Sequence, residues 1–202
     1  MLFLNILPLF ILAVHGHSWV DCVKWNSESN KCEGYPRGYP GRESESINTD
    51  YAYLIEGNPQ SKPICNPKQQ QFRNYTKMYP GAVATPGERI TTTWEPNGHY
   101  NKTETKKVRI LYYEDLNKEL LDFNERDIAD VAETMYFATN DTCTDITEPN
   151  TVCKNQWTVP ESLIPGKIYK FVWLWDYGYN KAGEQYSTCF DIKIVPNYRC
   201  PV

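Results

Sequence analysis

Residues Tyr169–Tyr177 read YKFVWLWDY, a run in which every second side chain is aromatic. Successive side chains of an extended strand point to opposite faces, so one face of this run carries Tyr169, Phe171, Trp173, Trp175 and Tyr177. Large aromatic side chains are mostly buried in folded proteins, and we expect Phe171 and Trp173 to lie in the core. The stretch therefore predicts a central strand of a β-sandwich.

Further segments have a strand-like composition, being rich in Thr, Val, Ile and aromatic residues between Pro, Gly or Asn. They are Glu88–Trp94, Lys107–Tyr113, Gln156–Val159, Ile168–Trp175 and Gln185–Ile194. Asp21–Pro80 has little periodicity and reads as a long loop region, and Asn124–Phe137 is expected to hold a helical turn. With no internal repeat, the pattern predicts an all-β, immunoglobulin/fibronectin-like β-sandwich with long disulfide-tied loops.

The first residues, MLFLNILPLFILAVHG, contain no charged side chain. This run is too short to span a membrane and stands where an export signal belongs. We expect residues 1–16 to be a signal peptide cleaved after Gly16, and residues 17–202 to be a single secreted domain and a monomer. No other segment is apolar enough to span a bilayer, so no membrane association is expected.

The composition agrees with export through an oxidising compartment. All seven Cys follow residue 16, and Asn-X-Ser/Thr sequons, which predict glycosylation, stand at Asn74, Asn101 and Asn140. The net charge of −4 argues against a nucleic-acid partner, because such binding depends on Lys and Arg that neutralise phosphates.

Cleavage after Gly16 would make His17 the first residue of the mature chain. A free α-amine and an imidazole on one residue can chelate one metal ion, and little ordering entropy is lost. A second imidazole would complete a planar set of three nitrogens, which favours one copper ion as Cu(II).

His99 is the second candidate ligand, because His15 leaves with the signal peptide and no other His remains. It lies in TTTWEPNGHY, where a Thr-rich strand runs into a Pro-Asn-Gly turn. A lone His is more often a surface or hydrogen-bonded residue. We favour the ligand role of His99 here, because the expected cleavage places the other His, His17, at the free N-terminus.

The segment GEQYSTCFDI places a carboxylate and a phenol on one face of a strand. Glu184 and Tyr186 are two residues apart, whereas Cys189 points the opposite way and can tie down a different loop. A structural role, with Tyr186 packed and Glu184 at the rim, is the common alternative.

These motifs together resemble the lytic polysaccharide monooxygenases (LPMOs). The resemblance rests on His at the expected mature N-terminus, Asn-Gly-His after a strand, and Glu-x-Tyr-x-x-Cys near the C-terminus. It implies that His17 and His99 form a copper-binding histidine brace and that Tyr186 is the axial residue. Glu184 stands where fungal cellulose-active members have Gln, so the branch and its substrate cannot be carried over.

The resemblance implies oxidative cleavage of glycosidic bonds in a polysaccharide, with an external electron donor and hydrogen peroxide or oxygen. Glu184 would position the oxidant by hydrogen bonding and by its charge. Rigid amphipathic rings suit sugar stacking, and the loop candidates for this role are Tyr35, Tyr39, Tyr100, Tyr177 and Tyr179.

Two other functions remain open. A non-catalytic copper protein of the same fold would capture copper or attach to cell walls, and Asp21 or Asp191 is the candidate Asp that such relatives often place at the metal. A glycan-binding module would bind no copper at all. A hydrolase is disfavoured because neither a Ser-His-Asp pattern nor a pair of catalytic carboxylates stands out.

Seven Cys cannot all pair within one chain. In LPMOs the Cys of the last strand holds a long early loop, which implies a Cys65–Cys189 bridge here. Cys143 and Cys153 are close enough in sequence for a local bridge. For the rest, we favour a bridge from Cys22 or Cys32 to Cys200, and a local Cys22–Cys32 bridge is nearly as plausible.

Overall fold

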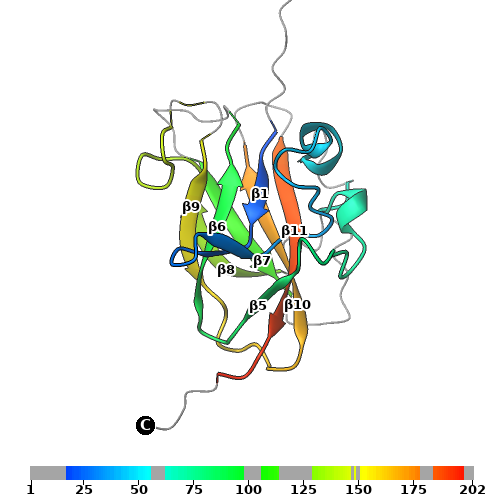
Figure 1. The fold of residues 1–202 in the computed structure, drawn as a ribbon, viewed down its shortest axis with the longest axis vertical. Coiled ribbons are helices and arrows are strands. Elements are labelled where there is room, and N and C mark those ends of the chain that lie inside the picture. Colours follow the sequence, from blue (N-terminus) through cyan, green and yellow to red (C-terminus); the bar gives the residue numbers. More distant parts are fainter. Residues whose placement is uncertain are drawn as a thin grey trace, which may run out of the picture.

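A computed structural model describes residues 17–55, 62–97, 106–113, 129–146, 148, 151–177 and 184–197. Two sheets form a sandwich (Figure 1). The small sheet has the order β1-β6-β9, with β1 (Trp19–Cys22), β6 (Arg89–Glu95) and β9 (Cys153–Thr158). The large sheet has the order β4-β11-β10-β7-β8, with β4 (Tyr53–Ile55), β11 (Gln185–Ile194), β10 (Ile168–Asp176), β7 (Lys107–Tyr112) and β8 (Asp130–Tyr136). The predicted β-sandwich is confirmed.

Three short strands complete the fold. β5 (Ala82–Ala84) runs parallel to the end of β11, and β2 (Lys24–Asn26) and β3 (Lys31–Gly34) form a separate antiparallel hairpin. The hairpin follows β1 directly and contacts β6. It therefore covers part of the outer face of the small sheet (Figure 1).

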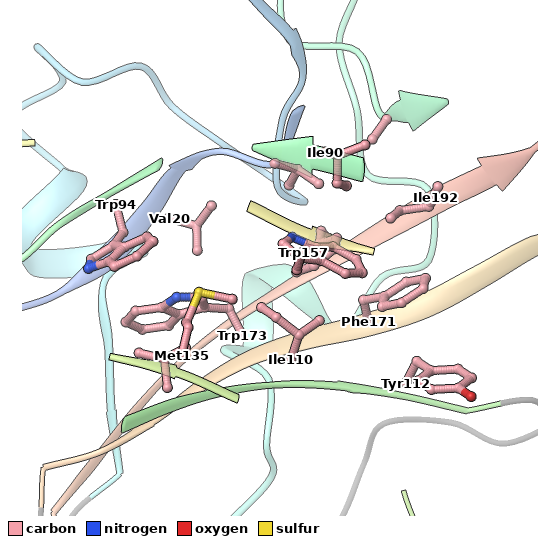
Figure 2. Packing of buried hydrophobic residues seen from close by; sticks show 14 of the residues in the cluster. Val20, Ile90, Trp94, Ile110, Tyr112, Met135, Trp157, Phe171, Trp173 and Ile192 are labelled. Atoms are coloured by element: carbon pink, nitrogen blue, oxygen red, sulfur yellow. The ribbon is translucent and has the colours of Figure 1, made fainter. Parts of the chain in front are cut away.

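Aromatic side chains fill the space between the two sheets (Figure 2). Trp173 and Phe171 of β10 are fully buried, as the alternation predicts, and they pack against residues of the small sheet that include Trp94 and Trp157. The indole N–H groups of the latter two donate to the Phe137 carbonyl at 2.9 Å and to Thr92 Oγ1 at 2.8 Å. The core thus buries these rings and satisfies the indole N–H groups of Trp94 and Trp157, whereas Nε1 of Trp173 is buried without a hydrogen-bond partner among the described residues.

The outer face of the large sheet is covered by the segment that connects β3 to β5. Val172 and Leu174, on the second face of β10, pack there against Ile64 and Cys65. Deeper in this contact, the guanidinium of Arg37 forms a buried ion pair with Asp191 of β11 and donates to the Gln69 carbonyl at 3.0 Å. The predicted loop region is therefore fixed on the sheet.

Two expectations about secondary structure were wrong. The helical turn expected in Asn124–Phe137 is replaced, over the part that the structure describes, by strand β8, which pairs with β7. Pairing at the sheet edge decides the conformation there, as tertiary context often overrides local preference. The region Asp21–Pro80 also contains short regular elements, namely β2 to β4, the π-helical turn η1 (Ile47–Tyr51) and the 3₁₀ turn η3 (Pro67–Gln69).

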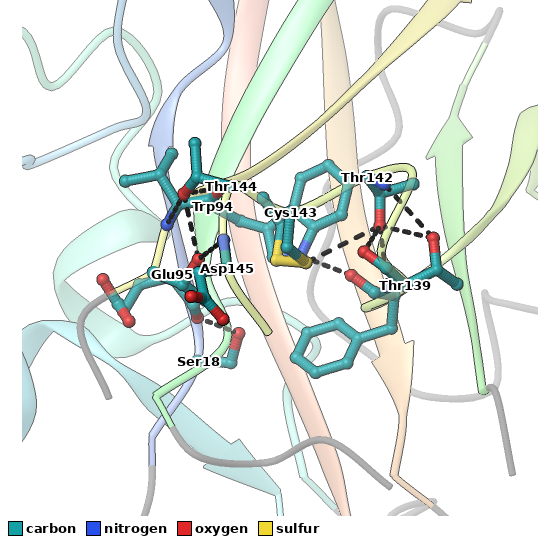
Figure 3. The surroundings of a disulfide bond; sticks show 12 residues. Ser18, Trp94, Glu95, Thr139, Thr142, Cys143, Thr144 and Asp145 are labelled. Carbon is teal, nitrogen blue, oxygen red and sulfur yellow. Dashed lines mark hydrogen bonds between the residues drawn. A yellow bond between two sulfur atoms is a disulfide. The ribbon is translucent and has the colours of Figure 1, made fainter. Parts of the chain in front are cut away.

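Three disulfides join described residues. Cys65–Cys189 ties the loop region to β11, and Cys143–Cys153 closes a local loop beside β9 (Figure 3); both pairs were expected. The third bridge is Cys22–Cys32, which corrects the favoured pairing of one of these residues with Cys200. The β2–β3 hairpin brings Cys32 back beside β1, with Cα atoms 5.8 Å apart, whereas β11 runs away from that region toward the other end of the sandwich.

Two of the three sequons lie in described residues. Asn140 is exposed in a turn, and Asn74 is partly exposed and donates to the Lys68 carbonyl at 3.0 Å. Asn101 lies outside the described residues, as does Cys200. None of the helices in the described ranges is long and apolar enough to cross a membrane.

Candidate metal centre at the N-terminal end of the sandwich

His17 is partly exposed and stands immediately before the small sheet. Strand β1 pairs antiparallel with β6, with Trp19 opposite Glu95. The Ser18 hydroxyl is buried and donates to the Glu95 carbonyl at 2.6 Å (Figure 3). Since antiparallel strands run in opposite directions, the segment that leads into β1 lies beside the end of β6.

His99, the second expected ligand, lies outside the described residues. In the sequence it follows Asn97 by two residues, and Asn97 is the last described residue after β6. Asn97 has a positive φ of 44° and its backbone N–H donates to Glu95 Oε1 at 3.2 Å. A left-handed Asn next to a Pro fits the turn that the sequence predicts at the end of this strand.

Glu184 and Tyr186 lie at the start of β11, in the hairpin with β10. Tyr186 is opposite Trp175, and its ring stacks on that indole with centroids 5.3 Å apart. The Tyr186 hydroxyl donates to a carboxylate oxygen of Glu184, and both side chains are largely buried. The phenol and the carboxylate therefore project together on the core side of the strand.

The N-terminal segment and this pair occupy the same end of the sandwich. The Val20 backbone N–H of β1 donates to Thr188 Oγ1 of β11 at 3.2 Å. Both strands start at the same end of the molecule (Figure 1). Ser18 lies two residues before Val20, and Tyr186 lies two residues before Thr188. His17, Glu184 and Tyr186 thus converge at one end, where β6 also terminates.

A charged cluster fixes the outer side of β1 and β6. Arg42, on the segment after β3, pairs with both Asp21 and Glu95. The second carboxylate oxygen of Asp21 accepts from Trp19 Nε1 and from the Tyr39 hydroxyl, each at 3.0 Å. Arg42 and Glu95 were not among the predicted residues, although alternation along TTTWE places a carboxylate on the face opposite Trp94.

Burial controls the acidity of this cluster. Glu95 is 3% exposed, and burial raises its pKa to about 7, although Arg42 and the Asn97 N–H act in the opposite direction. Burial likewise raises the pKa of Asp21, opposed by Arg42 and by its hydrogen bonds. The charged forms of both carboxylates are therefore disfavoured by desolvation.

The Asp residues considered for a non-catalytic copper protein have other partners. Asp191 lies five residues after Tyr186, on the opposite face of β11, where it pairs with Arg37 and accepts from the Tyr75 hydroxyl at 3.1 Å. Asp21 is engaged by Arg42, Trp19 and Tyr39. Among the candidate Tyr, Tyr35, Tyr39 and Tyr177 are described, and Tyr100 and Tyr179 lie outside the described residues.

The donors at this end fit copper by their chemistry. Signal cleavage would leave an amine and an imidazole at His17, at the same end of the sandwich as a buried phenol–carboxylate pair and beside the strand that leads to His99. Within the described ranges, no three His, Cys, Asp or Glu side chains are grouped closely enough to hold a metal ion. A site that contains His99 extends beyond those ranges.

Comparison with known proteins gives a family without an assigned activity. A family model described as a domain of unknown function (DUF7492) matches residues 14–111 and 118–200. No curated protein matches the chain.

Some solved structures are similar in fold. The catalytic domain of an LPMO from Listeria monocytogenes is 12% identical, with 89% of this chain and 100% of that chain covered and a TM-score of 0.46. An AA10 LPMO from Photorhabdus luminescens is 13% identical, with 71% and 79% covered and a TM-score of 0.40. A chitin-binding domain from Burkholderia pseudomallei is 9% identical, with 58% of each chain covered and a TM-score of 0.38.

Proposed function

Because the chain belongs to the DUF7492 family of domains of unknown function, we propose its function from its own residues: a secreted copper enzyme that oxidatively cleaves glycosidic bonds in a polysaccharide. Its mature chain would begin at His17, and residues 17–202 would form one domain. The amine and imidazole of His17 and the imidazole of His99 would hold one copper ion.

The observation that carries this proposal is the convergence of separate strands at one end of the sandwich. The start of β1, the end of β6 and the start of β11 meet there (Figure 1). They bring the expected N-terminus to the same end as the Tyr186–Glu184 pair and beside the strand that leads to His99. Residue 17 and the pair 184 and 186 are far apart in the sequence, so their position at one end of the sandwich supports this part of the grouping inferred from the motifs.

Bound copper would supply the one-electron chemistry that activates hydrogen peroxide or oxygen. The chain's own groups would control access and protons. The stacked and nearly buried ring of Tyr186 is held rigidly by Trp175, so it can limit approach from its side. The Glu184 carboxylate can accept or return a proton beside the site, and its hydrogen bond from Tyr186 fixes its orientation.

The engagement of both Asp candidates favours an enzyme over a copper carrier. Asp191 faces away from Tyr186 and is paired with Arg37, while Asp21 is paired with Arg42. Neither is available without breaking a buried or partly buried ion pair. The three disulfides and the export signal expected in residues 1–16 support secretion.

Product analysis tests the proposal. The protein starting at His17 is incubated with cellulose, chitin, xylan or pectin, together with copper, a reductant and hydrogen peroxide. Mass spectrometry should detect oxidised oligosaccharides from at least one substrate, and His99→Ala or a copper chelator should abolish them. Tight copper binding without oxidised products from a broad substrate panel would instead indicate copper capture.

A further inference from the structure

A hollow of about 440 Å³ lies on the outer face of the small sheet, on the side of β1 and β6 away from the core. The β2–β3 hairpin, the segment 35–42 and the loop before β9 surround it. Its volume is within the range of small-ligand pockets, and it is partly open to solvent. The Cys22–Cys32 disulfide forms part of its wall and fixes the hairpin to β1.

Aromatic rings give the hollow apolar surfaces that are reachable from solvent. Trp25 of the hairpin and Tyr35 are both partly exposed and line it. Tyr35 stacks on Tyr39 with centroids 5.3 Å apart and meets Tyr79 edge-on at 5.0 Å, so its ring is held in place. Partly exposed aromatic rings suit the C–H faces of a sugar ring.

Polar groups of both signs surround these rings. Arg42, Asp21 and Lys154 line the hollow, and Glu95, at the end of β6, pairs with Arg42. Two cationic and two acidic side chains balance one another when all are charged. A neutral ligand with many hydroxyl groups matches this lining, because each hydroxyl can both donate and accept.

We propose that this hollow is a binding site for a neutral oligosaccharide, separate from the copper centre. The sugar ring would stack on Trp25 and Tyr35, and its hydroxyls would contact Arg42 and Lys154. The site contains none of the proposed copper ligands. Sugar binding here depends neither on bound metal nor on the oxidative activity proposed above.

The test uses the protein starting at His17 after metal removal, titrated calorimetrically with soluble neutral cello- and chito-oligosaccharides. Val152→Trp places a large side chain at the wall of the hollow, and Trp25→Ala removes a stacking surface. The matched control is Tyr136→Ala, an aromatic residue that is 51% exposed on β8 and is not part of the hollow. An oligogalacturonide serves as the acidic competitor, and thermal melting confirms that each variant is folded.

We expect saturable binding of a neutral oligosaccharide, weakened about tenfold or more in Val152→Trp and in Trp25→Ala. Binding should be unchanged within about twofold in Tyr136→Ala, since that ring is remote from the hollow. Absence of binding by the unaltered protein, or equal binding by the folded Val152→Trp variant, would overturn the proposal. Preference for the oligogalacturonide would overturn the neutral-ligand assignment. Absence of copper-dependent activity together with intact sugar binding would contradict the oxidative function proposed above and would leave the sugar site supported.

Discussion

The Tyr186 hydroxyl donates a hydrogen bond to the carboxylate of Glu184, which lies two residues earlier, immediately before strand β11. The phenol ring of Tyr186 is 1% exposed and stacks on Trp175, so packing in the core holds this ring in place. The hydrogen bond from Tyr186 holds the Glu184 carboxylate in one orientation. This relationship makes the roles of the two residues separable by mutation.

Glu184→Ala should lower turnover about 10- to 100-fold while copper affinity changes much less, because the carboxylate supplies charge and orientation and is not expected to be a copper ligand. Tyr186→Phe should retain copper and alter its electron paramagnetic resonance spectrum modestly. Steady-state product release and copper titration measure the two effects. Unaltered turnover in Glu184→Ala would remove Glu184 from the mechanism.

The buried pair of Arg37 and Asp191 predicts a large stability effect. Asp191→Ala leaves the guanidinium, which is 2% exposed, without its carboxylate, and we expect a loss of about 3–5 kcal/mol. Lys68→Ala is the matched control, because its ion pair with Asp50 is exposed and should contribute less than about 1 kcal/mol. Urea unfolding at neutral pH measures both, and similar losses would contradict the buried character of the first pair.

Glu95 predicts a pH dependence of stability. Its pKa rises from an ordinary value of 4.5 to about 7 in the folded state, so the folded protein binds the proton more tightly than the unfolded chain. The contribution of Glu95 to the free energy of unfolding should therefore be full below about pH 4.5, decrease as the pH rises toward 7, and be lost above. The difference from this group amounts to about 3 kcal/mol.

Glu95→Gln isolates this contribution. The amide retains an acceptor for Arg42 but does not titrate, so the slope of stability between pH 4.5 and 7 should flatten relative to the unaltered protein. Unfolding by urea at a series of pH values gives the slope. An identical slope in both proteins would show that the raised pKa of Glu95 does not contribute to it.

The cysteine arrangement predicts one unpaired thiol. The three bridges use six of the seven Cys in the sequence, and Cys200 is the one that they do not use. Peptide mapping without reduction should recover Cys22–Cys32 and an alkylated Cys200. Removal of Cys22 and Cys32 together should cost about 2–3 kcal/mol of stability, since the bridge closes a loop with a sequence separation of 10. A Cys32–Cys200 peptide would contradict the pairing.

Much of the sandwich could be predicted because its central strands carry strong patterns. The aromatic residues at alternate positions of Tyr169–Tyr177 lie on the face of β10 that packs in the core between the sheets, and β11 has the predicted bounds Gln185–Ile194. β8 was mistaken for a helical turn because its side chains are mostly exposed at a sheet edge. Its conformation is set by pairing with β7, which no local pattern encodes.

The candidate site was predictable only in part. Motif spacing pointed to His17, Glu184 and Tyr186, which are grouped by strands that lie far apart in the sequence. The ion pair of Arg42 and Glu95 could not be predicted from the sequence, because it depends on how the segment after β3 folds back over β1 and β6. The Cys22–Cys32 bridge was not the favoured prediction for a similar reason. It depends on the β2–β3 hairpin, and a three-residue strand in a polar hairpin gives almost no periodic signal in the sequence.

Copper held by the free N-terminus of His17 is the central claim, and calorimetric titration with Cu(II) tests it most directly. Three proteins are compared: one that starts at His17, the same protein with one Ser added before His17, and His99→Ala. The first should bind one copper ion tightly, and each of the other two should bind it weaker by orders of magnitude. Unchanged affinity in both altered proteins would contradict the claim.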